Sequence, residues 1–218
     1  MNQQEPVPNP NVPKAVVSRL SLYLRELQQL SRSGHATISS SKLGRRLGVT
    51  DAQVRKDFAY FGQFGYPGIG YKCDELSDQI RKILGTDQIW PVALVGCGNL
   101  GQALLGYRGF SKQGFEVVAA FDIAADLVGN QIEGIPIHHL DDLAQIRQQH
   151  HIQIAILAVP AAKANLAVAH IVDAGITGIM NFAPVTLSIP KNVNIVEVDL
   201  AKELEQLSFA VTRGTGKS

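Results

Sequence analysis

The residues most suited to chemistry are three glycines in the segment VALVGCGNLG, residues 92–101. Gly96, Gly98 and Gly101 have the spacing G-x-G-x-x-G, which is typical of loops that bind the pyrophosphate of a dinucleotide. The apolar residues 90–95 before them predict a buried strand, and QALLGYRGF after them predicts a helix. The phosphates would therefore face a helix N-terminus that directly follows a strand, which is the context this motif requires.

A carboxylate stands where a fold of this kind contacts ribose. The segment FEVVAAFD predicts a second strand and ends at Asp122, 21 residues after Gly101. A carboxylate there accepts hydrogen bonds from the adenosine ribose hydroxyls and repels a 2′-phosphate, so we predict NAD(H) in preference to NADP(H). IQIAILAVP, a helix to Ala174, GIMNF and NIVEVD continue the alternation of strands and helices. We expect an α/β Rossmann domain with a doubly wound parallel sheet.

Groups that would use this cofactor for catalysis are few. His138 and His139, like His150 and His151, are adjacent and point to different sides of a helix or strand, so they make poor metal ligands or proton relays. Cys97 holds a variable position of the glycine loop, and we assign it a structural or incidental role. We expect no second domain to hold a substrate against the nicotinamide, hence no enzyme and no metal site.

The first half of the chain predicts helices. Residues 14–33 form one helix that Gly34 ends, and a serine caps a shorter helix in SSSKLGRRLG, residues 39–48. In the shorter helix, Gly44 shares a side with Leu43 and Leu47 and allows a second helix to approach closely. The first helix turns one apolar face inward, made by Val16, Leu20, Tyr23, Leu24, Leu27 and Leu30.

The third helix has a face suited to DNA. It begins at the capping box TDAQ, with Thr50 as N-cap and Gln53 three residues later, and continues as DAQVRKDFAYF to Gly62. Helical spacing turns Val54, Phe58 and Phe61 inward. Small residues between long polar ones suit a major groove, although a solvated helix face is the alternative. The outer face carries Ala52, Lys56, Ala59 and Tyr60, with Gln53 and Arg55 at its edges.

A hairpin and a connecting helix complete the first half. FGQFGYPGIGYKC alternates aromatic residues with Gly and Pro-Gly, which predicts a hairpin and, with the helices before it, a winged helix. A connecting helix covers residues 73–85. We expect a disordered leader at 1–13, a winged-helix domain at 14–85, a Rossmann domain at 86–198, and a C-terminal helix with a polar tail at 199–218.

Charge is divided unevenly along the chain. Residues 1–82 hold 12 Lys/Arg and 7 Asp/Glu, a net +5, whereas residues 83–218 hold 8 and 12, a net −4. A basic first half favours a polyanionic partner such as DNA. No run of about 18 apolar residues predicts a membrane span, and two distant cysteines indicate the reducing cytoplasm.

Segments spread over residues 14–209 resemble the Rex family of redox-sensing transcriptional repressors. In chain order they are SRLSLYLREL, QVRKDFAYFGQFGYPGIGY, GCGNLGQALLGY, FD, AVPA, NFAP and VDLAKELEQL. The string QVRKDFAYFG beside a Rossmann glycine loop is highly specific, because neither winged helices nor dehydrogenases carry that pair. The resemblance implies a homodimer that binds a palindromic operator, is released by NADH, and responds less to NAD+.

The resemblance also assigns residues to tasks. For DNA these are Gln53, Arg55 and Lys56 on the recognition helix, joined by Tyr60 from the same helical face, and Tyr66 and Tyr71 in a wing at residues 64–71. For the cofactor they are Gly96, Gly98, Asn99, Leu100, Gly101 and Asp122, with Val159, Pro160, Asn181 and Phe182 near the nicotinamide. Many relatives have a lysine or arginine where Tyr66 stands, followed here by Pro67, so a phosphate contact is missing or made by a phenol hydroxyl.

Three residues match family positions assigned to switching: Arg19, Tyr107 and Asp199. In relatives the Asp and the Tyr lie by the nicotinamide, and the Asp exchanges its partner for the Arg. An apolar pocket disfavours the cationic oxidised ring by desolvation and tolerates the neutral reduced ring. Our hypothesis is that NADH lets Asp199 turn to Arg19. The recognition helices of the dimer then no longer match successive grooves, about 34–36 Å apart.

The last predicted helix needs a partner surface. LAKELEQLSFAV places Leu200, Leu204 and Leu207 on one stripe. In the family this helix exchanges between subunits, and packing on its own subunit is the alternative. Two other functions stay open: an NAD-dependent dehydrogenase with a helical appendage, and a repressor whose pocket holds another nucleotide or a coenzyme A derivative.

Overall fold

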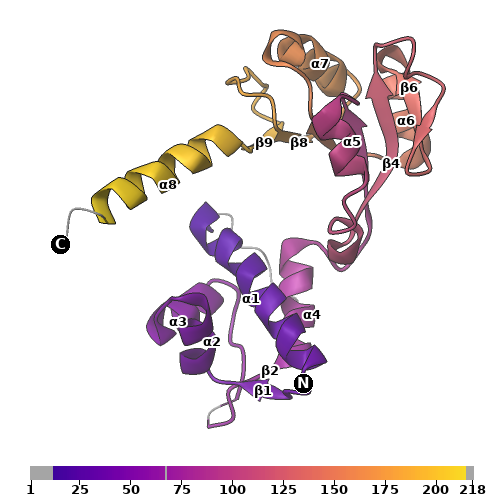
Figure 1. Ribbon diagram of the computed structural model, residues 1–218. Helices are drawn as coiled ribbons and strands as arrows, with labels where there is room; N and C mark the ends of the chain where they lie inside the picture. Colours follow the sequence, from indigo (N-terminus) through magenta and orange to yellow (C-terminus); the bar gives the residue numbers. More distant parts are fainter. Residues whose placement is uncertain (1–11, 67, 215–218) are drawn as a thin grey trace. The chain divides into compact units, whose positions relative to one another are not determined.

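The chain forms two compact units. The computed structural model describes residues 12–66 and 68–214, and divides the chain into Met1–Gln88 and Ile89–Ser218 (Figure 1). The expected leader lies outside the described residues except for Val12 and Pro13, as does the tail after Gly214.

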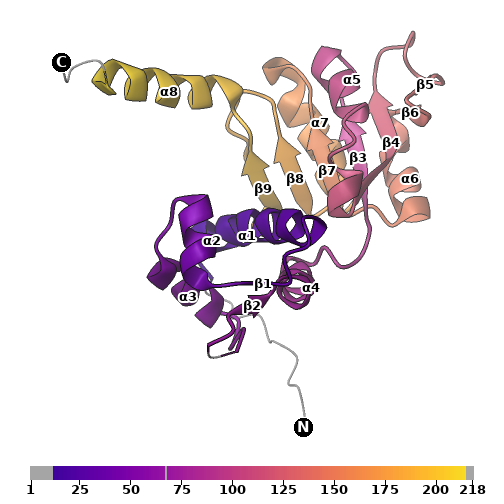
Figure 2. The ribbon, with the colours of Figure 1, turned by 60° about the horizontal axis from the view of Figure 1, so that its bottom comes forward.

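The first unit is a winged helix. Its elements are α1 (Lys14–Arg32), β1 (Thr37–Ile38), α2 (Ser40–Leu47), α3 (Asp51–Ala59), β2 (Tyr71–Lys72) and α4 (Cys73–Leu84). In Figures 1 and 2, α2 and α3 lie on one side of α1 and α4 lies on the other. Strands β1 and β2 pair in antiparallel fashion. The predicted fold of this half is confirmed, with α3 in the place of the recognition helix.

Local contacts explain how α2 leads into α3. Thr50 Oγ1 accepts a hydrogen bond from Gln53 N at 3.1 Å, which confirms Thr50 as the N-cap. Gly48 ends α2 with a φ of +70°, a conformation that glycine adopts easily. A Cβ on Gly44 would lie 2.6 Å from the carbonyl oxygen of Val49. Gly44 therefore permits a close approach as predicted, but by the loop before α3 and not by a helix.

The core of this unit fixes the inner face of α3. Phe58 is 3% exposed and makes edge-to-face contacts with Tyr23, Phe64 and Tyr71 at centroid distances of 5.2–5.5 Å. All six residues predicted for the inner face of α1 are buried, and all except Val16 pack into the same cluster: Val16, Leu20, Tyr23, Leu24, Leu27 and Leu30.

The predicted hairpin is a turn closed by one bridge. Tyr66 N donates to Gly70 O at 2.9 Å, and Gly70 N donates to Tyr66 O at 3.0 Å. Gly68 and Gly70 have φ values of +79° and +88°, which explains the glycines in this segment. Position 67 lies outside the described residues. The turn leads directly into β2.

The second unit is built on one large sheet. Its strands are β3 (Trp90–Val95), β4 (Phe115–Asp122), β5 (Gln131–Ile132), β6 (Ile135–His139), β7 (Ile154–Leu157), β8 (Gly178–Asn181) and β9 (Asn194–Glu197). They lie in the order β5-β6-β4-β3-β7-β8-β9, with only β5 antiparallel to its neighbour. The chain starts in the middle at β3, adds strands on one side, and crosses to add β7 on the other. This is the predicted Rossmann topology.

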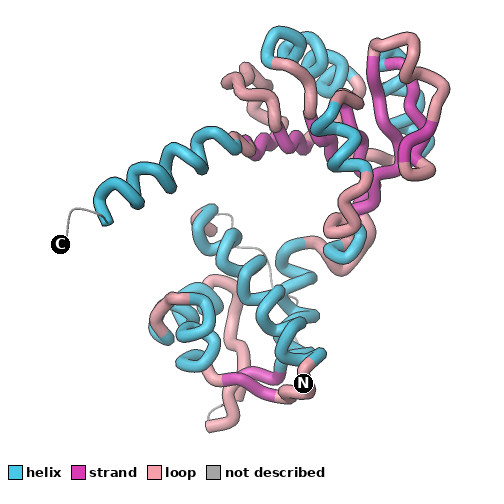
Figure 3. The backbone as a smooth tube through the Cα atoms, viewed as in Figure 1, coloured by secondary structure: helices cyan, strands magenta, loops and turns pink. Residues whose placement is uncertain are grey.

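Helices cover both faces of this sheet. They are α5 (Asn99–Leu105), α6 (Leu143–His150) and α7 (Ala161–Asp173), with short 3-10 turns at Ser111–Gln113 and Leu140–Asp142 (Figure 3). Alternate residues of β3 serve the two faces. Val92 and Leu94 share a cluster with Leu105 of α5, whereas Ala93 and Val95 pack with residues of α6 and α7. A parallel strand buried on both faces is accordingly apolar throughout.

Helix α8 (Leu200–Gly214) follows β9. Its predicted stripe is exposed: Leu200 is 60% exposed, Leu204 67% and Leu207 59%. Within the described residues, no helix is long and apolar enough to span a membrane.

Candidate nucleotide and nucleic-acid sites

Two of the three motif glycines are required by the packing of the fold, and the third faces open space. Gly96 has a φ of +99°, and a Cβ there would lie 2.6 Å from the carbonyl oxygen of Ala158. A Cβ on Gly101 would collide with the carbonyl oxygen of Gly96, so helix α5 packs against the strand only without one. Around Gly98 a Cβ would meet no chain atom within 4 Å. Gly98 thus presents the open side, from which a phosphate can reach the backbone.

The glycine loop lies where the strand order reverses. It follows β3, whose neighbours β4 and β7 belong to opposite halves of the sheet. Gly98 precedes α5, which begins at Asn99, and Leu100 is 38% exposed. The first amides of a helix have no partner within it, so this end of α5 can donate hydrogen bonds to an anion.

Asp122 is hydrogen-bonded to the glycine loop. Its Oδ2 accepts a hydrogen bond from Cys97 N at 2.6 Å, and its Oδ1 accepts from Ile123 N at 2.7 Å and Ala124 N at 3.0 Å. The half-buried carboxylate therefore joins the end of β4 to the glycine loop. A ribose placed here would meet a carboxylate already fixed by backbone donors.

Cys97 is not a reactive thiol. It is fully buried, and burial raises the pKa of its thiol to about 12, helped by the charge of Asp122. The structural role expected from its place in the loop agrees with this burial.

Asn181 holds the loop after β8. It is 2% exposed, its Nδ2 donates to Ala183 O at 3.1 Å and Val185 O at 3.2 Å, and its Oδ1 accepts from Ala183 N at 2.8 Å. A cavity of about 160 Å³ at the ends of β8 and β9 is lined by Asn181 and Asp199 with neighbouring residues. Two predicted residues, from the nicotinamide and switch groups, thus share one cavity.

The other residues predicted to lie near the nicotinamide have different places. Val159 is half-buried and Pro160 exposed where β7 leads into α7, and Phe182 is half-buried after Asn181. None of these three lines the cavity described above.

Two of the three predicted switch residues lie in the second unit. Tyr107 is 58% exposed and meets Phe110 edge to face at 5.0 Å. Asp199 caps α8, because its Oδ1 accepts from Ala201 N at 3.0 Å and Lys202 N at 3.1 Å.

Arg19, the third, has a partner that the sequence analysis missed. Its Nε and Nη2 donate to the two carboxylate oxygens of Asp57 at 2.6 and 2.7 Å. Asp57 is wholly buried on α3. The inner face of this helix was predicted from Val54, Phe58 and Phe61, and Asp57 was overlooked, although its position three residues after Val54 also faces inward.

The predicted DNA contacts on α3 and the wing differ in exposure. Lys56 is exposed, and exposed Arg55 donates to Asp51 at 2.7 Å and to Ser40 at 3.2 Å. Tyr60 is half-buried and Tyr66 is 53% exposed. Gln53 is half-buried at the edge of α3.

The position of Tyr71 differs from the prediction. It was expected to contact DNA as part of the wing, but it is only 8% exposed and its ring packs against Phe58. Tyr71 follows the turn as the first residue of β2, so alternation along the strand turns it into the core. Burial also raises the pKa of its hydroxyl.

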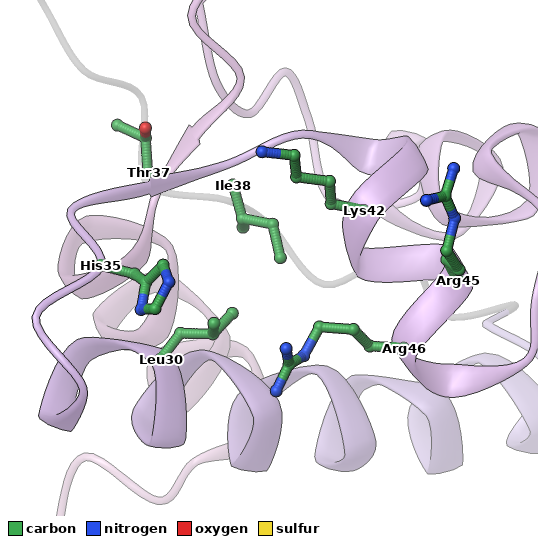
Figure 4. A pocket seen from close by; sticks show the side chains of 7 residues that line it. All are labelled: Leu30, His35, Thr37, Ile38, Lys42, Arg45 and Arg46. Carbon is green, nitrogen blue, oxygen red and sulfur yellow. The ribbon is translucent and has the colours of Figure 1, made fainter.

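A cationic pocket lies between α1, β1 and α2 in the first unit. It has a volume of about 200 Å³, and Figure 4 shows side chains of α1, β1 and α2 around it. Leu30 and Ile38 supply apolar lining. The remaining lining residues are His35, Thr37, Lys42, Arg45 and Arg46. These cations were not among the predicted site residues, although the run GRRL in a short capped helix was a signal for them.

The cations of this pocket are not equivalent. Arg46 forms an ion pair with Glu26, whereas Lys42 and Arg45 have no ion-pair partner in the described part of the chain. Both of these side chains are exposed. They can therefore contact an external anion without giving up a contact inside the unit.

The described residues show no cluster of three or more His, Cys, Asp or Glu side chains arranged for a metal. His139 and His170 both lie beside Asp141, at 3.2 and 3.3 Å.

The chain is similar to known proteins along most of its length. Residues 87–185 match the family described as "CoA binding domain", and residues 11–59 match "Putative DNA-binding protein N-terminus". A redox-sensing transcriptional repressor Rex of Carboxydothermus hydrogenoformans is 45% identical over 202 residues, which are 93% of this chain and 97% of the relative. A repressor of the same name from Streptomyces coelicolor is 43% identical over 206 residues, 94% of this chain and 80% of the relative.

Solved structures of RSP, a Rex-family repressor, have the same fold. The complex of RSP with β-NAD+ and operator DNA matches at a TM-score of 0.89 and 35% identity, covering 95% of each chain. The complex with β-NADH matches at a TM-score of 0.85 and 33% identity, covering 95% of this chain and 97% of that chain.

Proposed function

Because the chain belongs to the Rex family of redox-sensing transcriptional repressors, we propose that it binds operator DNA as a homodimer and leaves it when NADH binds. One observation carries this proposal: a single chain holds both a basic winged helix and a glycine loop whose open side can receive a pyrophosphate. Both DNA and NADH are present in the cytoplasm, where we place its action.

The dehydrogenase alternative is not favoured, because relatives that match both units are named as repressors. This chain is a regulator and not an enzyme. A coenzyme A derivative is the other candidate ligand, since one matching family is described by that binding. Its 3′-phosphate would approach the carboxylate of Asp122, and repulsion between the two disfavours it.

In the proposed complex the cofactor lies across the glycine loop. The pyrophosphate approaches Gly98 and the start of α5, and the adenosine ribose donates to Asp122. The nicotinamide reaches the group formed by Val159, Pro160, Asn181 and Phe182. Asp199 lines a cavity with Asn181, which supports its role beside the ring.

Charge then distinguishes the two redox states. The oxidised ring is cationic, so a carboxylate facing it offsets the cost of desolvation, and the reduced ring needs no such partner. Replacing Asp199 with Ala is expected to weaken NAD+ binding more than NADH binding, because the cationic ring loses the carboxylate that offsets its desolvation. Calorimetry that gives an unchanged affinity ratio would reject this role for Asp199.

On the DNA side, α3 enters a major groove with Gln53, Arg55, Lys56 and Tyr60, and Tyr66 contacts the backbone from the wing. Lys42 and Arg45 extend the contact to a neighbouring phosphate, because both are exposed cations on the helix before α3. The homodimer forms through α8, whose exposed apolar stripe packs on the partner subunit.

Fluorescence anisotropy tests the proposal. The probe is a labelled duplex carrying the sequence that the wild type selects from random DNA, titrated with NADH, NAD+, NADPH and coenzyme A in separate arms. We expect release at the lowest concentration with NADH. Release that shows no preference for NADH would refute the sensor function. Preferential release by coenzyme A would show that a coenzyme A derivative, and not NADH, is the effector.

A further inference from the structure

Asp57 connects two side chains that were assigned to different tasks. Besides the two bonds from Arg19, its carboxylate accepts from Tyr23 Oη at 2.8 Å and from Gln53 Nε2 at 2.7 Å. The side chain of Asp57 is 0% exposed. One buried carboxylate thus joins the switch arginine on α1 to a residue of the recognition helix.

This arrangement fixes which end of the Gln53 amide faces inward. An ionised carboxylate only accepts hydrogen bonds, so the amide must turn its NH₂ group, and not its oxygen, toward Asp57. One N–H is used in that bond. The second N–H and Oε1 are left on the other edge of the amide, at the side of α3 predicted to meet DNA.

We propose that Asp57 is a positioning residue for base recognition, which holds the Gln53 amide so that its second N–H and Oε1 together bind an adenine. In the major groove adenine presents the N7 acceptor next to the N6 donor, and a glutamine amide can pair with both. Because the amide is already oriented, less conformational entropy is lost on binding. This inference rests on the proposed function, since it requires α3 to read DNA.

Arg19 supplies the charge that keeps the carboxylate stable in the core. Burial by itself would raise the pKa of Asp57, but the hydrogen bonds from Arg19, Tyr23 and Gln53 outweigh it and hold the pKa below its usual value. A buried carboxylate deprived of its cation is strongly disfavoured. When NADH brings Asp199 to Arg19, Asp57 loses that cation and Gln53 its fixed orientation. The redox signal then reaches a base-reading side chain.

The test measures base preference position by position. The wild type and each variant select duplexes from the same random-sequence library in the absence of NADH. For the wild type we expect adenine at one position of each half-site, preferred by about 5- to 150-fold, the discrimination of one bidentate pair. Gln53→Ala loses this preference. Asp57→Asn keeps the shape but not the charge, and reduces the preference there to about threefold or less, with other positions unchanged.

A matched control and a second variant complete the design. Glu75→Gln also removes one negative charge from the first unit, from an exposed pair with Lys72 at 2.6 Å, and is expected to leave every preference unchanged. Combining Gln53→Ala with Asp57→Asn should cause no loss at that position beyond Gln53→Ala alone. If circular dichroism shows that Asp57→Asn does not fold, Arg19→Gln replaces it. The Arg19 side chain is 25% exposed, and we expect the same position to relax.

The outcomes separate the inference from the proposed function. An adenine preference that survives in Asp57→Asn, or in Arg19→Gln, overturns the inference and leaves the repressor intact. Equal weakening at all positions also overturns it, because a purely structural role for Asp57 has that effect. A wild type that selects no sequence refutes the proposed function and the inference together.

Discussion

Helices α1 and α8 have the same kind of pattern and opposite surroundings. Each carries apolar residues on one stripe, at 20, 24 and 27 in α1 and at 200, 204 and 207 in α8. In α1 these leucines are at most 3% exposed, whereas in α8 they are at least 59% exposed. An apolar stripe shows that a helix needs a partner, but it does not show whether the partner belongs to the same unit.

The same distinction separates other groups of this chain. Gly101 is required by the packing of its own unit and Gly98 is not, and Arg46 has an ion-pair partner that Lys42 and Arg45 lack among the described residues. We infer that groups satisfied inside a unit maintain the fold. Groups left open are available for the dimer, the cofactor and the DNA.

The largest effect is expected at the exposed apolar stripe of α8. Leu204→Gln with Leu207→Gln should leave each unit folded and give the mass of one 23.5 kDa chain by analytical ultracentrifugation. Operator affinity should fall by about 10²–10⁴-fold, because two linked half-site contacts become separate ones.

Phe209→Gln is the matched control for α8. Phe209 is 60% exposed, as much as the leucines, but it lies on the opposite side of the helix. It should leave the dimer intact. Dimer loss in this variant alone, or a dimer that survives the double variant, would contradict the proposed interface.

The next largest effect is expected at the buried apolar stripe of α1. Leu27→Ala should lower the free energy of unfolding by about 2–5 kcal/mol, because it leaves a cavity at a fully buried position. Leu22→Ala on the same helix, at a 44% exposed position, should change it by about 0.5 kcal/mol or less. Urea unfolding followed by circular dichroism measures the free energy of unfolding of both variants. Equal losses would contradict the difference between the buried and exposed faces of α1.

The glycines sharpen the comparison within one loop. Gly101→Ala and Gly98→Ala should both weaken NADH binding. Only Gly101→Ala should also destabilise the fold, by about 1–3 kcal/mol, because its new methyl group meets the carbonyl of Gly96. Calorimetry with NADH and thermal unfolding of each variant distinguish them. A destabilised Gly98→Ala would show that this position also serves the fold.

The smallest effect concerns the cationic pocket. Removing the charge at Lys42 or Arg45, each as a change to Gln, should reduce the slope of log affinity for DNA against log salt by about 0.9. The preference among sequences should stay unchanged, because phosphate contacts carry no base information. Slopes equal to that of the wild type would exclude both residues from the interface.

The sequence predicted best what depends on local pattern. The buried face of α1, the Thr50 cap and the strand–glycine loop–helix unit all follow from spacing along a few turns or one strand. The role of Asp57 could not be predicted in the same way, because its partner Arg19 lies 38 residues earlier in the chain. Tyr71 was misassigned since the length of the turn before it decides which side of β2 it occupies.

Only part of the cofactor-site prediction rests on local pattern. The glycines and Asp122 belong to one local unit, and the structure connects them through the bond from Cys97 N. The residues assigned to the nicotinamide come from strands far apart in sequence, and only the resemblance to a family named them. The spacing of these residues along the sequence does not show that they lie close together until the strand order is known.

NADH is expected to change the distance between the two recognition helices of the dimer. Double electron–electron resonance reports this change through a spin label on Gln29→Cys, an exposed position of α1 in the same unit as α3. The native Cys73 and Cys97 are buried, so the label is selective. We predict one distance distribution with NAD+ and operator DNA and a clearly shifted one with NADH. Superimposable distributions in the two states would contradict the account.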